Sequence, residues 1–199
     1  MDLVIPFARP LLAGLLFLRF ADAASSEPPP AVAKVLKLFA DLNAAQQNPA
    51  AQRRVSFTLN EAELNQHFRH SLAVTPRPGI ESIFVKIFPN NYISTFTMVD
   101  FDAVERWKPG TIPSLMKPVL SGKRTVWTDF RFQSDQGQAK FTVEKAYFEK
   151  IPIPAFVVNR VIEALGASQP EKYDTTAPLP LPLGLKKAWT EGNLLKGEN

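Results

Sequence analysis

The sequence predicts an α+β fold, in which a meandering antiparallel β-sheet is curved around, or packed on, two to three α-helices. Three observations lead to this prediction. Apolar residues recur at helical spacing in segments near both ends of the chain. Between these segments, apolar and polar residues alternate in two pairs of strands, each joined by a short turn. The 199 residues are enough for one such domain with a hydrophobic core.

The first 23 residues have the layout of a secretory signal peptide. A short apolar run over residues 11–18 is followed at residues 21–23 by small residues in an A-x-A cleavage pattern. The run is shorter than the about 20 apolar residues that span a bilayer. We therefore expect residues 1–23 to be removed on export. An uncleaved membrane anchor is the alternative, because Arg19 and Asp22 lie close to the cleavage site.

Residues 24–30 are predicted to be a proline-rich, extended linker, and residues 31–199 a single domain. The domain begins with an amphipathic helix over residues 31–45, which Asn48 and Pro49 terminate. Its apolar stripe consists of Val32, Val35, Leu36, Phe39 and Leu42. We expect this stripe to pack in the core; a helix lying on a membrane is the alternative.

A short strand over residues 55–58 is predicted to run into a second helix that ends near Leu72. Thr58 and Glu61 have the spacing of a capping box, in which the hydroxyl and the carboxylate each accept a backbone N–H. The proline-rich residues 75–79 stop this helix.

Two hairpins follow. Residues 80–88 and 92–101 form the first, and residues 123–134 and 138–148 form the second. In the first hairpin, both faces are rich in apolar side chains. One face carries Ile83, Val85, Ile87, Ile93, Val99 and Phe101, and the other carries Phe84, Phe88, Tyr92, Phe96 and Met98. In the second hairpin, we expect Phe141, Val143 and Tyr147 to share one face.

The remaining segments are less regular. Residues 103–121 contain a turn at 107–110 and then either a short helix or an ordered loop. Pro154 suits the first position of a further apolar helix, which Gly166 ends. The proline-rich residues 178–184 predict an extended crossing, and a final hairpin turns at residues 191–193.

Composition excludes several kinds of chemistry. The chain has no cysteine, which removes thiol nucleophiles and zinc–thiolate sites and, in an exported protein, favours the bacterial periplasm. No nucleophile elbow, phosphate-binding loop or dinucleotide fingerprint occurs, so we expect no enzyme activity and no cofactor. His67 and His70 are the only two histidines, and we expect them on a solvated helix face without a metal.

The formal net charge of +4 suits contact with an anionic surface. Three basic pairs could make this contact: Arg53–Arg54, Lys123–Arg124 and Lys186–Lys187. Nucleic-acid binding is not expected, because the neighbouring aromatic residues follow the core pattern and the chain is predicted to be exported. The two apolar faces of the first hairpin leave two alternatives: protein covers both faces, or one face lines a groove for a hydrophobic ligand.

Three sequence stretches resemble a known family. They are Phe57–Asn65 (FTLNEAELN), Ile151–Pro154 (IPIP) and Pro180–Lys187 (PLPLGLKK), the last followed by a Glu-Gly turn. In this order they resemble bacterial exported or membrane-anchored proteins of the LmeA/YpmS type, which are distant relatives of the tubular lipid-binding (TULIP) superfamily. The resemblance covers about residues 55–196. The helix at residues 31–45 is not part of the family pattern.

The resemblance implies a TULIP-like half-barrel, with a long curved sheet around a helix and an apolar groove for lipid. We therefore predict a periplasmic lipid-binding or lipid-transfer protein that contacts an anionic membrane transiently. The groove is predicted to be lined by Phe84, Phe88, Phe96, Met98, Phe156 and Ile162. Lys123, Arg124, Lys186 and Lys187 are predicted to contact lipid head groups. The alternative function is a non-enzymatic envelope module with a filled core that binds a protein partner.

Overall fold

The computed structural model describes most of the chain from residue 27 onward. The described residues are 27–48, 54–107, 109–110, 112, 114, 117–118, 120–154 and 178–199. Within them lie the helices α2 (Pro30–Gln47), α3 (Glu61–Val74) and α4 (Phe101–Trp107), and the short 3-10 helix η3 (Pro182–Gly184). The predicted signal peptide, and the predicted helix that would hold Phe156 and Ile162, lie outside the described residues.

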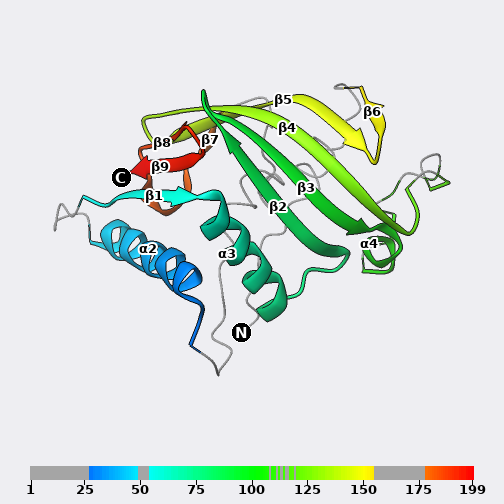
Figure 1. Cartoon of the computed structure of the whole chain (residues 1–199), viewed down its shortest axis with the longest axis horizontal. Coiled ribbons are helices and arrows are strands. Elements are labelled where there is room, and N and C mark those ends of the chain that lie inside the picture. Colours follow the sequence, from blue (N-terminus) through cyan, green and yellow to red (C-terminus); the bar gives the residue numbers. More distant parts are fainter. Residues whose placement is uncertain are drawn as a thin grey trace.

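The described strands form two antiparallel sheets, which confirms the predicted α+β class (Figure 1). The large sheet has the order β2-β3-β4-β5-β6, and β7 also pairs with β5. These strands are β2 (Ile80–Phe88), β3 (Tyr92–Asp100), β4 (Lys123–Asp135), β5 (Gln138–Phe148), β6 (Ile151–Ile153) and β7 (Leu179–Pro180). The small sheet has the order β1-β9-β8, formed by β1 (Ser56–Asn60), β8 (Lys187–Glu191) and β9 (Leu194–Glu198).

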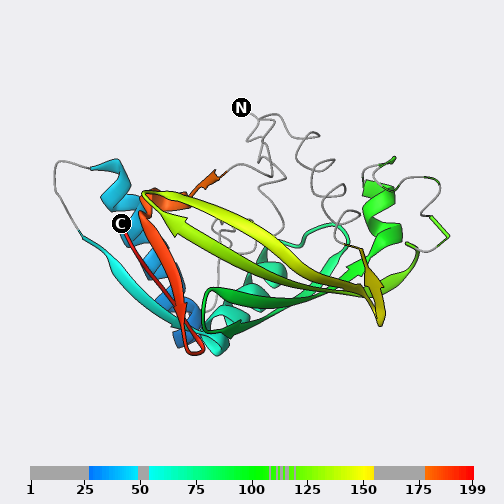
Figure 2. The same ribbon diagram turned by 90° about the horizontal axis from the view of Figure 1, so that it is seen from above.

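The large sheet is open and curved, consistent with a half-barrel. Figure 2 shows the small sheet and α4 rising from its two ends on the same side. At one end, the Ala188 N–H of β8 donates to the Ser134 hydroxyl of β4 over 2.7 Å. At the other end, Phe101 of α4 lies 5.6 Å from Phe148 of β5, measured between ring centroids. We call the sheet face that bears Ser134 and Phe148 the inner face, and the opposite face the outer face.

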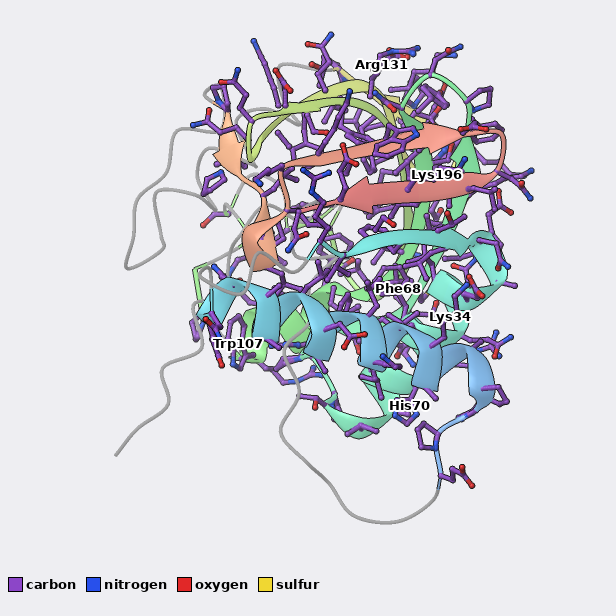
Figure 3. The ribbon with its side chains drawn as sticks, turned by 90° about the vertical axis from the view of Figure 1, so that its left-hand side faces the viewer. Lys34, Phe68, His70, Trp107, Arg131 and Lys196 are labelled. Carbon is purple, nitrogen blue, oxygen red and sulfur yellow. The ribbon has the colours of Figure 1, made fainter. Side chains whose placement is uncertain are left out.

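The core joins α2, α3, the small sheet and the near end of the inner face. Val35, Leu42 and Phe68 are at most 1% exposed, and they pack in one cluster with residues of both sheets. Figure 3 labels Phe68 between the small sheet and α2, whereas Arg131 lies at the upper edge of the molecule. The predicted stripe of α2 is largely buried, with Leu38 and Ala45 added to it.

The cap of α3 differs from the prediction. The Asn60 side chain accepts the Glu63 N–H, and the Glu63 carboxylate accepts the Asn60 N–H, each over 2.9 Å. The box is therefore two residues further along than Thr58 and Glu61, because β1 continues to Asn60. The Glu61 carboxylate instead accepts the Ile87 N–H on the free edge of β2, over 2.8 Å.

The second correction concerns β5. Asp129 is opposite Lys145 but Phe130 is opposite Val143, so Glu144 is an extra residue in β5. Such a β-bulge reverses the alternation of the residues beyond it. Tyr147 therefore lies on the outer face, and not with Phe141 and Val143 as the simple alternation predicted.

Candidate functional site

A row of aromatic side chains crosses the outer face of the large sheet. The register places four such residues side by side on four successive strands: Phe84, Phe96, Trp127 and Tyr147. Successive ring centroids are 6.3, 5.3 and 4.9 Å apart. The last three rings are stacked, with interplanar angles of 21° and 27°. We call these four residues the aromatic row.

A buried carboxylate holds the indole of the aromatic row in place. Asp129 is only 3% exposed although it lies on the outer face. It accepts hydrogen bonds from the Trp127 indole N–H over 2.7 Å and from the Ser94 hydroxyl. Burial, and then the hydrogen bond to Asp129, raise the pKa of Tyr92 to about 12. Three neutral donors therefore satisfy this carboxylate, as a buried charge requires.

Two lysines flank the aromatic row. Lys86, Ser94, Asp129 and Lys145 occupy the next row of the same face. Both lysines are exposed, and neither makes a salt bridge with a described residue. Lys86 Nζ lies 5.7 Å from the Phe88 ring centroid. The outer face thus combines partly exposed aromatic rings with free positive charge.

The predicted groove residues lie together on this outer face. Phe84 and Phe96 belong to the aromatic row, Met98 is opposite Thr125, and Phe88 packs on Tyr92 at 5.5 Å. They therefore face away from the concave side of the sheet. Sequence reasoning missed Trp127 and Tyr147. Trp127 could have been found only from the register between the two hairpins, and Tyr147 only from the bulge at Glu144.

The predicted head-group lysines and arginine are not brought together. Lys123 pairs with Glu81, whose hydrogen bond raises the Lys123 pKa, and Arg124 lies 3.6 Å from Glu149. Lys186 and Lys187 are exposed at the small sheet, at the other end of β4. Two of the four charges therefore already have acidic partners, and the other two lie apart from them.

The inner face is largely apolar, and its one charged residue on β4 is Arg124, opposite Val99 near the beginning of that strand. Between Val126 and Ser134 of β4, the inward residues are valine, threonine, phenylalanine and serine only. Val85, Ile93, Val99, Phe130, Phe132 and Phe148 of this face are all buried. Thr95 and Thr97 are its buried hydroxyls on β3.

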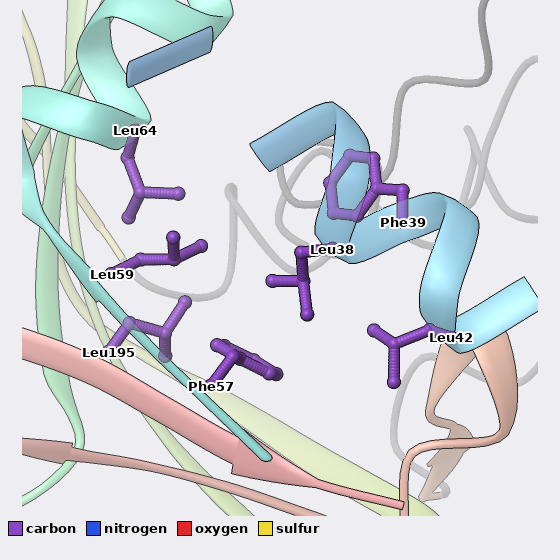
Figure 4. A pocket seen from close by; sticks show the side chains of 7 residues that line it. All are labelled: Leu38, Phe39, Leu42, Phe57, Leu59, Leu64 and Leu195. Atoms are coloured by element: carbon purple, nitrogen blue, oxygen red, sulfur yellow. The ribbon is translucent and has the colours of Figure 1, made fainter. Parts of the chain in front are cut away.

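The described residues line hollows on two sides of the helices. A small gap of about 20 Å³ lies between α2 and the small sheet, lined by apolar side chains that Figure 4 shows, and it has room for about one water molecule. An open hollow of about 630 Å³ runs along α3. It is lined by Pro29, Val32, Glu61, Ala62, Asn65, Gln66, Arg69, His70, Ala73 and Phe84. Phe84 therefore belongs both to this hollow and to the aromatic row.

The two histidines differ, contrary to the prediction of one solvated pair. His67 is 1% exposed and packs edge-on against Phe39, with ring centroids 5.3 Å apart. Burial, with a smaller contribution from His70, lowers the His67 pKa to about 4. The periodicity of α3 explains this, because His67 shares the buried side of the helix with Leu64, Phe68 and Ser71.

Comparison with family models, curated proteins and solved structures found no match. Within the described part of the chain, no three histidine or acidic side chains gather as a metal site, and no helix is long and apolar enough to cross a membrane. The features of the described chain that indicate a function are therefore the two faces of the large sheet.

Proposed function

We propose that this protein is an exported, non-enzymatic protein that binds a lipid or another hydrophobic ligand on the inner face of its curved sheet. One observation carries the proposal. From Val126 to Ser134 of β4, the concave side of the sheet is lined by residues without charge, and the small sheet and α4 rise as walls on that side. Apolar concave surfaces with few polar groups are typical of hydrophobic ligand sites.

The energetics favour an acyl chain as the ligand. Each buried methylene contributes about 0.8 kcal/mol, so a chain of a dozen carbons contributes about 10 kcal/mol, from which the costs of ordering the ligand and the protein are subtracted. Thr95 and Thr97 offer the few hydroxyls that orient such a ligand. The predicted alternative, a module with a filled core, is favoured by the small volume of the gap beside α2.

The proposal is tested by native mass spectrometry of gently purified protein, together with an organic extract of the same sample. We expect added mass that the extract identifies as lipid. Protein of the unliganded mass with an empty extract would contradict ligand binding and favour the protein-interaction alternative.

Adjacent residues provide a matched pair of variants. Val126 points inward, opposite Thr97, and Thr125 points outward, opposite Met98. We expect Val126→Trp to fill the concave side and to reduce bound lipid several-fold, whereas Thr125→Trp leaves it unchanged. Circular dichroism checks that both variants fold. Loss of lipid in Thr125→Trp alone would move the ligand to the outer face.

A further inference from the structure

The aromatic row and its flanking lysines have no role in the function proposed above, which uses the opposite face. Phe84 is 49% exposed, and Phe96, Trp127 and Tyr147 are partly exposed. We propose that the outer face of the large sheet docks on an anionic lipid bilayer, with the aromatic row at head-group level and Lys86 and Lys145 on lipid phosphates. This inference does not require a ligand on the inner face.

The side chains of the row suit the boundary between head groups and acyl chains. Tryptophan and tyrosine prefer this boundary because each ring has an apolar body and a polar atom. Because Phe96, Trp127 and Tyr147 stack on one another, they present ring edges outward and lose little side-chain freedom on docking. Phe84, at the β2 end of the row, is the most exposed ring of the four and is free to insert.

The charges favour a lipid phosphate over a neutral surface. The acidic side chains near the aromatic row are already committed: Asp129 is buried among its donors, Glu144 accepts from Arg131 over 2.7 Å, and Glu81 pairs with Lys123. Lys86 and Lys145 have no such partner among the described residues. The face therefore offers unneutralised positive charge beside its apolar row.

The spacing of the two lysines fits contact with separate head groups. They occupy one row on β2 and β5, which are three strand spacings apart. At about 4.8 Å per spacing, their backbones are about 14 Å apart. Long lysine side chains reach from such positions past the ring edges toward the lipid phosphates.

Vesicle flotation with the full chain tests this docking. The probes are vesicles of phosphatidylcholine alone and vesicles with 30% phosphatidylglycerol. We expect the protein to float with the anionic vesicles at low salt, and the bound fraction to fall at high salt, because exposed charges are screened. Absence of binding to anionic vesicles at low salt would overturn the proposal.

Two double variants of equal net charge locate the surface. In Lys86→Gln/Lys145→Gln, we expect partitioning to fall by about 30-fold, because each lysine near an anionic surface contributes about 1 kcal/mol. In Lys186→Gln/Lys187→Gln, on the small sheet, we expect no change. An equal loss in both doubles would overturn the assignment to the outer face. Phe84→Gln removes an exposed ring of the aromatic row, and we expect this single variant also to weaken binding to the anionic vesicles.

Vesicle flotation and the lipid extract test the two proposals independently. Binding to vesicles with an empty extract would leave the docking face standing and remove the inner-face ligand. Lipid in the extract without vesicle binding would support the inner-face ligand and contradict the docking of the outer face.

Discussion

The Asn65 side chain occupies the place of a neighbouring strand beside Val85. Its Oδ1 accepts the Val85 N–H over 2.7 Å, and its Nδ2 donates to the Val85 carbonyl over 2.9 Å. With Glu61 on the Ile87 N–H, α3 closes the free edge of β2 by side chains alone. The unpaired backbone groups of an edge strand can pair with a strand of another chain, and here these side chains occupy such groups of β2.

Replacing Asn65 by alanine is expected to destabilise the fold by about 2–4 kcal/mol, because two hydrogen bonds are lost and two buried backbone groups are left without partners. Urea denaturation followed by circular dichroism measures this. Gln66→Ala, one residue along and exposed, serves as the control and is expected to change stability by less than about 0.5 kcal/mol. Equal effects of the two substitutions would contradict a specific role for Asn65.

Acidification is expected to destabilise the protein through His67. The unfolded chain protonates this residue near its usual pKa of 6.5, whereas the folded chain does so only at about 4. The stability contribution is therefore present above pH 6.5 and is lost as the pH falls from 6.5 to 4, by about 3 kcal/mol in total. Denaturation midpoints at several pH values measure the slope. This dependence of stability on pH between 6.5 and 4 should vanish in His67→Phe and persist in His70→Gln.

Gly79 and Gly122 form a matched pair for backbone strain. Both have positive φ, 78° and 63°, but a Cβ on Gly79 would meet Val104 Cγ2 at 2.2 Å, whereas one on Gly122 meets open space. Gly122→Ala is therefore expected to cost about 1–2 kcal/mol for the left-handed conformation alone. Gly79→Ala should cost about 1–3 kcal/mol more, for the overpacking against α4. Similar thermal midpoints for the two variants would contradict this.

The hydrogen bond from the aromatic row to Asp129 is tested by Trp127→Phe, which keeps a stacked ring but removes the indole N–H that Asp129 accepts. We expect a loss of about 1.5–3 kcal/mol, because a buried carboxylate is left with one donor fewer. Trp189→Phe, in the small sheet beside the exposed Glu191, is expected to cost less. Denaturation of both variants under the same conditions makes the comparison.

Much of this fold follows from local pattern. The alternation over residues 80–88 fixed that strand and its faces, and the helical spacing over residues 31–45 fixed α2. Both patterns are reliable predictors of secondary structure because many successive residues follow one period. The assignment of Tyr147 failed because one inserted residue, Glu144, reverses a face without leaving a mark in composition.

The sites were harder to predict because they depend on contacts between distant elements. The sequence placed Phe84 and Phe96 on one face, but not which face is concave, since curvature depends on where the small sheet and α4 attach. Likewise, the burial of His67 required α2 to pack over it with Phe39, and the neutralisation of Lys123 required Glu81 from another strand. Such pairings have no signature in local spacing.

The pairing of β1 with β9 has a consequence for the order of folding. Val55 and Asn199 exchange two hydrogen bonds across a sequence separation of 144 residues. The small sheet therefore cannot close until nearly the whole described chain has emerged, and long-range pairing of this kind is slow. A chain threaded through a translocation pore from its first residue onward would stay incompletely folded until the passage of its last strand. In the export that we propose, this topology would keep the polypeptide competent for transport and complete the domain only at its destination.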